Sequence, residues 1–343
     1  MIDLDLTSYD YVISALSGGK DSIAATLSIQ EQMQAQGSKA ELICWHHSID
    51  GAPHGPDGKG LYGIPPDEPL MDWPITEDYC RRFCQHIGVP LELSFLSGGF
   101  KREMLRENQR KAPTFFEVPG EGFRSAGGVK GKLTTRRKYP QLSNDLQVRW
   151  CSGSLKIDVA DIALANQPER FNNRRILFIT GERREESPGR AKYAEFGPHR
   201  KHSPTKGRHI DHYRHVIDWT ERDIWDIFER RGIVPHPCYR IGFSRCSCAV
   251  CIFASDDQMA TLFAIAQEYV QKQAKHETMF GTTVHRTKSV MQRVFRGTPY
   301  EAIKATELVE LAMSRFYKGE IWVPPHRWEL PAGAYGEDKA GPT

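Results

Sequence analysis

The chain has 343 residues, of which 39% are hydrophobic and 26% charged, with a formal net charge of +3 at pH 7. This length allows one large domain or one domain with an appendage, and the near balance of charge argues neither for nor against a nucleic-acid partner. No apolar run has the length of a membrane span, and the first ten residues lack the basic and apolar regions of a secretory signal, so we expect a cytoplasmic protein without a membrane partner.

The first part of the chain alternates between strand and helix patterns. An apolar run over residues 9–16 predicts a strand, and a helical pattern then runs from Asp21 to a stop at Gly37. Further strands are predicted at 41–46, 89–96, 175–180 and 215–219, and further helices at 76–87 and 220–231, which end at Gly88 and Gly232. This alternation predicts an α/β fold with an open, mostly parallel sheet and helices on both faces.

Two long irregular stretches, 47–74 and 97–144, interrupt this rhythm. We assign residues 1–255 to the sheet domain, with a basic insertion at about 98–145, and residues 256–343 to a helical C-terminal extension. The helices predicted in the extension are 259–273, 284–294 and 300–317.

A glycine-rich loop, Ser17-Gly18-Gly19-Lys20-Asp21-Ser22, separates the first strand from the first helix. Glycines let backbone N–H groups approach phosphate oxygens, and the helix N-terminus adds unpaired donors and partial positive charge. Lys20 supplies a point charge, Ser17 and Ser22 supply hydroxyl donors, and Asp21 is a candidate ligand of Mg²⁺. The loop does not have the Walker A pattern. Its place between strand and helix favours phosphate binding over an ordinary solvated loop.

This loop resembles the signature of the PP-loop, or adenine nucleotide α-hydrolase-like, superfamily. Within it, the phosphoadenosine phosphosulfate (PAPS) reductase-like branch is most similar; it includes sulfonucleotide reductases, the small subunit of ATP sulfurylase and DNA phosphorothioation enzymes. Three further segments, 150–156, 181–190 and 218–225, carry the resemblance, which covers about residues 9–255. It implies that ATP is cleaved to AMP and pyrophosphate to adenylate an acceptor, with sulfur transfer to follow.

Three arginines follow the strand predicted at 175–180. Gly181 ends that strand, so the arginines lie beyond its carboxyl end, where ligands bind in open α/β sheets. Their guanidinium forks suit phosphate or sulfate oxygens, although a solvated charged loop is the alternative. Lys156 by itself would be interpreted as a surface lysine, and the resemblance places it near the nucleotide. Beyond the glycine-rich loop, the candidate catalytic or nucleotide-binding residues are therefore Lys156, Gly181, Arg183, Arg184 and Arg190.

Two features separate the chain from the sulfonucleotide reductases that it resembles. Those enzymes generally lack the loop lysine and carry a cysteine in a C-terminal motif, whereas this chain keeps Lys20 and has no cysteine after Cys251. We therefore expect ATP rather than PAPS as the nucleotide. A PAPS reductase, an ATP sulfurylase-like subunit and a non-catalytic nucleotide-binding subunit are the alternatives.

Four of the eight cysteines, Cys238, Cys246, Cys248 and Cys251, lie close together in the sequence. The C-x-x-C spacing of the last two is typical of zinc, iron–sulfur or redox sites. The resemblance adds Cys151 and implies a 4Fe–4S cluster on Cys151, Cys248 and Cys251, with Cys246 or Cys238 as a possible fourth ligand.

Zinc is an alternative metal because His236 is near, and a chain without metal is the third interpretation. Cys44, Cys80 and Cys84 are interpreted as buried packing residues. The implied sulfur transfer would require a sulfur donor such as a cysteine desulfurase.

The insertion is strongly basic, because residues 101–138 contain eleven Lys or Arg and four Glu. Phe115, Phe116 and Phe123 lie among them, and basic charge with aromatic rings suits a nucleic-acid backbone and base stacking. The alternative is a solvated loop that becomes ordered over ATP. A nucleic-acid acceptor is therefore one hypothesis for this chain.

Overall fold

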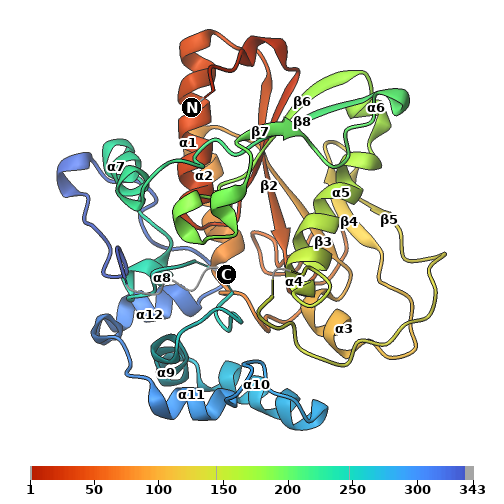
Figure 1. Cartoon of the computed structure of the whole chain (residues 1–343). Coiled ribbons are helices and arrows are strands. Elements are labelled where there is room, and N and C mark those ends of the chain that lie inside the picture. The colour runs from red at the N-terminus through yellow and green to blue at the C-terminus, as the bar shows by residue number, and fades with distance from the viewer. Residues whose placement is uncertain (1, 144, 247, 337–343) are drawn as a thin grey trace.

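The computed structural model describes residues 2–143, 145–246 and 248–336 and contains an eight-stranded sheet (Figure 1). The strands follow the order β5-β4-β3-β2-β1-β6-β8-β7 across the sheet. β3, β2, β1, β6 and β8 run parallel, whereas β4, β5 and β7 pair antiparallel at the two edges. The predicted α/β fold with a mostly parallel, open sheet is thus confirmed. The strands are β1 Tyr11–Ala15, β2 Glu41–Ser48, β3 Leu91–Leu96, β4 Thr114–Val118, β5 Gly122–Ala126, β6 Arg174–Ile179, β7 Phe196–Pro198 and β8 Arg208–Tyr213.

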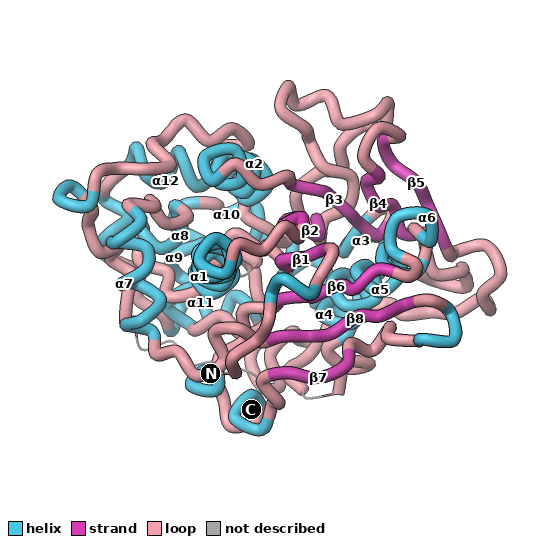
Figure 2. The backbone as a smooth tube through the Cα atoms, turned by 90° about the horizontal axis from the view of Figure 1, so that it is seen from above, coloured by secondary structure: helices cyan, strands magenta, loops and turns pink. Residues whose placement is uncertain are grey.

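Helices lie on both faces of the sheet (Figure 2), and α9, α10 and α11 lie below it in the view of Figure 1. They are α1 Lys20–Gln36, α2 Thr76–Ile87, α3 Gly99–Leu105, α4 Trp150–Ser152, α5 Asp158–Ala165, α6 Pro168–Phe171, α7 Glu221–Arg231, α8 Pro237–Arg240, α9 Asp256–Ile265, α10 Gln267–Phe280, α11 Val290–Arg296 and α12 Thr306–Met313. Among the described residues, none of these helices is both long and apolar enough to cross a membrane. The glycines predicted to end α1, α2 and α7 adopt left-handed conformations just after those helices.

Successive strand residues point to two separate apolar cores. Val12 of β1 packs with α1, α2 and α7, whereas the next residue, Ile13, packs on the opposite face with α5 and α6. Leu177 and Phe178 of β6 divide in the same way. This alternation, buried on both sides, explains why the central strands are continuous apolar runs. Burial on both faces also fixes the register between neighbouring strands. The carboxyl ends of the parallel strands therefore lie along one edge of the sheet.

The strand predicted at 215–219 is wrong. That segment is a turn, in which the Ile217 and Trp219 amides donate to the carbonyls of Arg214 and Val216. The strand that pairs with β6 on this side is β8, which lies just before residues 215–219 in the chain and consists mostly of polar residues. The sequence analysis did not predict β8 because its polar residues do not form an apolar run. It predicted a strand at 215–219 because Val216 and Ile217 are apolar, and both are buried in the turn.

The basic insertion is more regular than its sequence indicates. It contains α3 and the β4–β5 hairpin, which extends the sheet from β3. Phe115 stacks on Phe95 at 5.2 Å, Phe123 meets the same ring edge-on, and Phe116 is buried. These three rings therefore take part in the packing of the sheet, and the buried Phe116 cannot stack on a base.

The C-terminal helices also differ in detail from the prediction. The helix expected at 259–273 is divided into α9 and α10 at Ala266, α11 begins only at Val290, and the segment expected at 300–317 contains the short α12. Apolar residues of α9 to α11 join the core cluster that contains α1. The domain division at residue 255 stays a prediction.

Two buried histidines on or near β8 should make the protein sensitive to acid. Burial lowers the pKa of His199 to about 3 and that of His215 to about 4, from 6.5 in an unfolded chain. Below pH 6.5 the unfolded chain therefore binds more protons than the folded one. We expect the free energy of unfolding to fall between about pH 6.5 and pH 4, by up to about 1.4 kcal/mol per pH unit for each histidine.

Urea unfolding at pH 7.5, 6.0 and 5.0 measures this slope. Replacing His199 and His215 with glutamine should flatten it, whereas glutamine at the exposed His209 should leave it unchanged. Equal slopes in the double variant and the native chain would contradict this assignment.

Candidate active site

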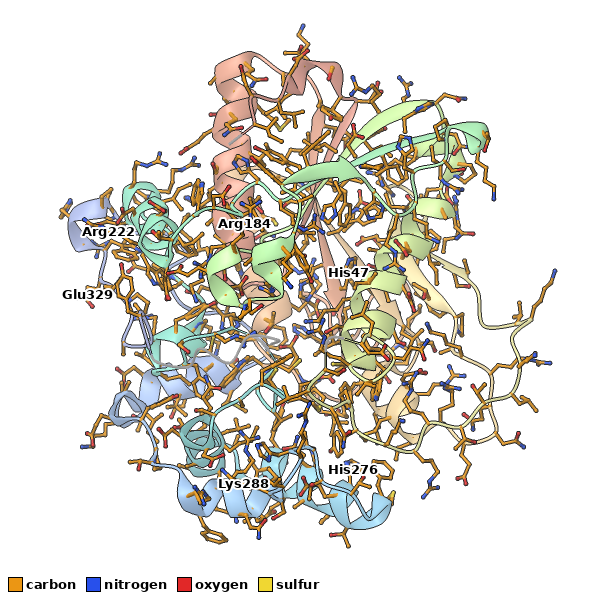
Figure 3. The ribbon with its side chains drawn as sticks, viewed as in Figure 1. His47, Arg184, Arg222, His276, Lys288 and Glu329 are labelled. Carbon is orange, nitrogen blue, oxygen red and sulfur yellow. The ribbon has the colours of Figure 1, made fainter. Side chains whose placement is uncertain are left out.

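A cavity of about 850 Å³ opens at the carboxyl ends of β1, β2 and β6. It contains most of the residues that the sequence indicates. These are Ser17, Gly19, Lys20, Asp21, Ser22, Cys151, Lys156, Gly181, Arg183, Arg190, Cys246, Cys248 and Cys251. Gly18, Arg184 and Cys238 are not among the described residues that line it. Figure 3 shows His47, another lining residue, at the end of β2, with Arg184 on the side toward α1.

The glycine-rich loop leads directly into α1. Gly18 has φ +78°, a conformation that favours glycine, and Lys20 is the first residue of the helix. The Ser22 hydroxyl donates to the Gly19 carbonyl at 2.8 Å and accepts from the Ser17 amide at 3.2 Å. The N-cap residue Gly19 has no side chain to cap this 17-residue helix, and the Lys20 amide is bound by the Tyr239 hydroxyl, so the amides of Asp21 and Ser22 are the first-turn donors that an anion in the cavity can use.

Lys20 is buried and held by residues far along the chain. Its Nζ donates to the Ser244 carbonyl at 2.9 Å and lies 3.5 Å from a Glu221 carboxylate oxygen. The ammonium also lies over the rings of Trp225 and Tyr239, with centroids at 5.8 and 5.4 Å. These contacts fix the charge at the cavity wall.

Asp21 and Arg183 form a largely buried ion pair next to Lys20. The Arg183 Nε lies 2.5 Å from Asp21 Oδ1, and Arg183 is only 3% exposed. Burial alone would raise the pKa of Asp21, but Lys20 and Arg183 hold that pKa below its ordinary value. Asp21 is therefore ionised and oriented, although one of its oxygens is already occupied by the arginine.

The two other predicted arginines differ in position. Arg190 lines the cavity and pairs with Glu186. Arg184 is not among the described lining residues; it pairs with Asp218 and donates at 3.1 Å to the carbonyl of Tyr193, which lines the cavity. Arg190 can therefore contact a ligand directly, whereas Arg184 reaches the cavity only through Tyr193.

Three cysteines surround Lys156 in the same cavity. Cys151 lies in α4, Lys156 in the π-helical turn that follows it, and Cys248 and Cys251 in the loop before α9. Lys156 is exposed, and although desolvation disfavours its ammonium, the three neighbouring thiols raise its pKa above the ordinary value. Burial raises the pKa of the Cys151 and Cys248 thiols, and the Lys156 cation acts in the opposite direction, toward the thiolates that bind metals.

Cys238 and Cys246 belong to a different group. Their sulfur atoms and a ring nitrogen of His236 all lie within 4.8 Å of one another, a separation at which one metal ion can bind all three. The sequence suggested His236 only by its proximity and placed these cysteines as a fourth ligand for the other group.

The sequence analysis did not identify several candidate functional side chains. Tyr239 accepts the Lys20 amide on its hydroxyl at 2.9 Å, and Arg149 and Arg245 line the cavity. Asp72 also lines it, and burial with the nearby Asp50 raises the pKa of Asp72 to about 6, which makes it a candidate proton acceptor. The available signals were weak: Arg149 and Tyr239 each adjoin a residue that the motifs include.

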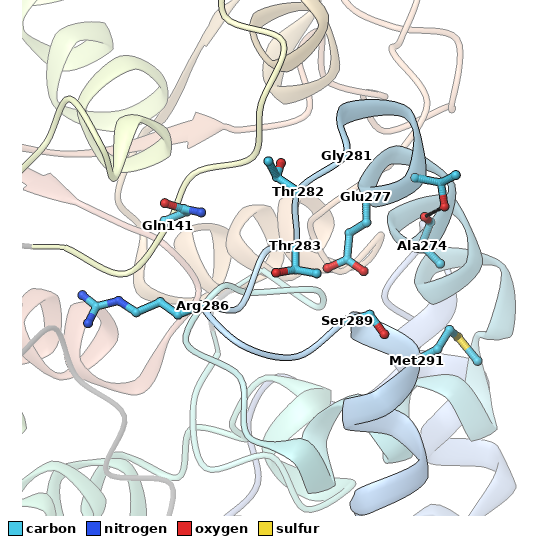
Figure 4. A pocket seen from close by; sticks show the side chains of 10 residues that line it. Gln141, Ala274, Glu277, Gly281, Thr282, Thr283, Arg286, Ser289 and Met291 are labelled. Atoms are coloured by element: carbon cyan, nitrogen blue, oxygen red, sulfur yellow. Dashed lines mark hydrogen bonds between the residues drawn. The ribbon is translucent and has the colours of Figure 1, made fainter.

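A second hollow, of about 590 Å³, lies between residue 141 and the α10–α11 region (Figure 4). Its buried carboxylate, Glu277, accepts the amides of Val284 and Val290 at 2.8 and 2.9 Å. Glu277 therefore fastens the loop before α11 to α10, and its carboxylate is occupied by the protein itself.

The fold and the cavity define an α/β protein with a mostly parallel sheet, in which a glycine-rich loop leads from the first strand into the first helix, the arrangement in which such folds bind phosphates. Residues 132–254 match the phosphoadenosine phosphosulfate reductase domain family. Over these residues the chain is similar to this family, which is part of the PP-loop superfamily.

Two curated proteins are similar to the chain. It is 28% identical over 214 residues to an uncharacterized 37.8 kDa protein of Escherichia phage 186, covering 62% of this chain and 58% of that protein. It is 33% identical over 76 residues to an adenosine 5'-phosphosulfate reductase of Neisseria meningitidis, covering 22% of this chain and 28% of the reductase. The match thus spans less than two thirds of either relative.

Proposed function

We propose that the protein binds ATP and catalyses attack of an acceptor on its α-phosphorus, which releases pyrophosphate. The observation that carries this proposal is the uncapped N-terminus of α1, which faces the same cavity as Lys20, Arg183 and Arg190. Backbone amides and fixed cations converge there on a volume that suits a nucleotide. Similarity to this family supports an adenine nucleotide as the ligand.

In the proposed reaction, an acceptor oxygen forms a bond to the α-phosphorus while the bond from that phosphorus to the bridging oxygen of pyrophosphate breaks. The acceptor proton passes to a base, for which Asp72 is the candidate in the cavity. Lys20 and the α1 amides stabilise the charge that develops on the departing phosphates. Mg²⁺ would enter with the phosphates, with Asp21 and Ser22 as its nearest candidate ligands.

Sulfur transfer is the proposed second stage. Cys151, Cys248 and Cys251 form a three-thiol donor set in the ATP cavity, and this set fits an iron–sulfur cluster that leaves one iron open. When bound, such a cluster would supply an iron that can carry sulfur. Lys156 holds the positive charge that favours thiolates in this set. A sulfur donor such as a cysteine desulfurase would be its partner.

The basic insertion supports a nucleic-acid acceptor through charge rather than through stacking. Several of its cations are internally paired: Glu103 binds both Arg106 and Arg136. Others are exposed and form no ion pair with a described residue. These are Lys101, Arg102, Arg110, Lys130, Lys132 and Lys138. They can contact phosphates without reading bases.

Product analysis tests the proposed reaction. Protein purified without oxygen should convert ATP labelled at the α-phosphate to AMP or an adenylated acceptor, with an equal amount of pyrophosphate. ADP with inorganic phosphate as products, or unchanged ATP in the presence of candidate acceptors, would reject attack at the α-phosphorus.

A sulfonucleotide reductase is the second candidate, because the chain is similar to an adenosine 5'-phosphosulfate reductase over 76 residues. Release of sulfite from adenosine 5'-phosphosulfate or PAPS, with a thiol reductant, would establish this activity. Absence of sulfite from both nucleotides, together with pyrophosphate from ATP, favours the first candidate.

Gly181 should prove essential for nucleotide binding. A β-carbon there would lie 2.7 Å from the backbone carbon and oxygen of Asp21 and 2.9 Å from the Ser22 amide. Since these are backbone atoms, Gly181→Ala must push the start of α1 away from β6. We expect ATP affinity to fall at least about tenfold and the free energy of unfolding to fall by about 1–3 kcal/mol.

Titration calorimetry with ATP and urea unfolding measure these two effects. Gly197→Ala is the matched control, because a β-carbon at Gly197 would meet nothing within 4 Å. If both variants bind ATP like the native chain, the close approach of β6 to α1 has no functional role.

A further inference from the structure

Behind the phosphate loop lies a buried set of metal-binding side chains that the proposed reaction does not use. His236 and Cys238 are fully buried, and their ligand atoms lie within 4.8 Å of one another and of the Cys246 sulfur. Cys238 and Cys246 are free thiols in contact with each other, and Cys246 also contacts His236. A nitrogen and two sulfur donors at this separation are the ligands that zinc prefers.

The hydrogen bonds of the histidine define its tautomer. Its Nε2 lies 3.4 Å from the Thr76 hydroxyl, which can accept the proton of that nitrogen. Its Nδ1 accepts a hydrogen bond from the Cys238 amide at 3.2 Å, at the start of α8. A metal ion bound at Nδ1 would take the place of that amide. A second hydrogen bond that fixes the tautomer is usual for histidines that bind metals.

A fourth donor lies next to these three. A β-carbon added to Gly18 would meet the Cys80 sulfur at 3.3 Å and the His236 ring at 3.7 Å, so both side chains touch the same point of the phosphate loop. Burial and the nearby Cys246 raise the pKa of the Cys80 thiol. Cys80 is thus a neighbour of the set and not only a packing residue of α2.

We propose that His236, Cys238 and Cys246 form a structural site for one zinc ion, and that Cys80, which lies beside these three residues but outside the 4.8 Å group, moves in as the fourth ligand when zinc binds. This site is distinct from the Cys151, Cys248 and Cys251 set around Lys156, and its role does not depend on the proposed reaction. Four protein ligands close the coordination sphere, as is typical of structural rather than catalytic zinc.

The position of the site indicates that a bound metal ion would support the glycine-rich loop. Residues between His236 and Cys246 support the phosphate loop: the Tyr239 hydroxyl accepts the Lys20 amide and the Ser244 carbonyl accepts the Lys20 ammonium. The Cys246 carbonyl lies against Gly19, 3.2 Å from where a β-carbon would be. An ion that joins this segment to α2 would therefore hold the loop in its binding conformation.

Metal analysis and cobalt substitution test the proposal on the native chain. We expect about one zinc ion per chain, retained after any iron has been removed. Cobalt(II) bound in its place should give the intense visible bands of tetrahedral coordination and the near-ultraviolet bands of thiolate ligation. A chain that holds no zinc, and that binds cobalt(II) without thiolate bands, would overturn the site.

Variants then assign the ligands. Cys238→Ser and Cys246→Ser should lose the zinc and the thiolate bands, and Cys80→Ser should weaken both. Cys151→Ser and Cys84→Ser, which alters a buried cysteine one turn from Cys80, should retain them. Loss of the metal in Cys151→Ser as well as in Cys246→Ser would mean one shared cluster and would reject a separate site. If the serine variants do not fold, the cobalt spectrum of the native chain still decides.

Discussion

Lys20→Ala should slow pyrophosphate release from ATP by about 100- to 1,000-fold, the usual effect of removing one preorganised group that stabilises transition-state charge. The structure explains why a cation from the surface cannot compensate. The Lys20 ammonium is fixed by the Ser244 carbonyl and by Glu221 at the cavity wall, and its backbone amide is bound by Tyr239. A mobile cation from the surface would have to lose its hydration and conformational freedom to reach the same place.

Steady-state pyrophosphate assays at saturating ATP measure this effect, with urea unfolding to verify the fold. Lys39→Ala is the control, because Lys39 is exposed just beyond the other end of α1. A Lys20→Ala variant that folds and releases pyrophosphate at the native rate would remove the loop lysine from the mechanism.

Arg183→Ala should lower the free energy of unfolding by up to about 3 kcal/mol, the lower end of the cost of breaking a buried ion pair, because the Asp21 side chain is 22% exposed. Arg183 is 3% exposed and pairs with Asp21 and Glu185, and it donates at 3.4 Å to the Trp219 carbonyl. Without the guanidinium, the partly buried Asp21 carboxylate loses its partner at 2.5 Å. Urea unfolding at pH 7 measures the loss.

The neighbouring arginine provides the matched control. Arg184 pairs with the exposed Asp218, so Arg184→Ala should cost less than about 1 kcal/mol. Adding Asp21→Asn to Arg183→Ala should restore part of the lost stability, because the stranded charge is then removed. If Arg183→Ala and Arg184→Ala lower the free energy of unfolding equally, the Arg183–Asp21 pair contributes no more to stability than the exposed Arg184–Asp218 pair.

The features that the sequence predicted well are local ones. The phosphate loop, its strand and its helix are adjacent in the chain, and Gly37, Gly88 and Gly232 end helices by their own backbone conformation. Apolar runs identified the central strands because those strands are buried on both faces. The polar β8 and the β4–β5 hairpin lack such runs, and only pairing with their neighbours makes them strands.

The cavity was predicted in outline and the cysteines only in part. Motif residues after β1 and β6 meet because parallel strands end at one edge. No local pattern reveals that Cys246 turns to His236 and Cys238 while Cys248, two residues later, faces Lys156. The separation of the two sulfur groups depends on where the chain turns between them, and Tyr239 and Ser244 gain their contacts with Lys20 in the same way.

The hydrogen bonds of Lys20 with Tyr239 and Ser244 also determine when the site can form during synthesis of the chain. These contacts join residues 219 and 224 positions apart. Strand β1 and the glycine-rich loop emerge from the ribosome early, but the loop gains its supports only after residue 244 has emerged. Long-range contacts of this kind slow folding, because a large loop of chain must close before they form. A nascent chain that ends before residue 236 would therefore carry the complete motif without a finished phosphate site.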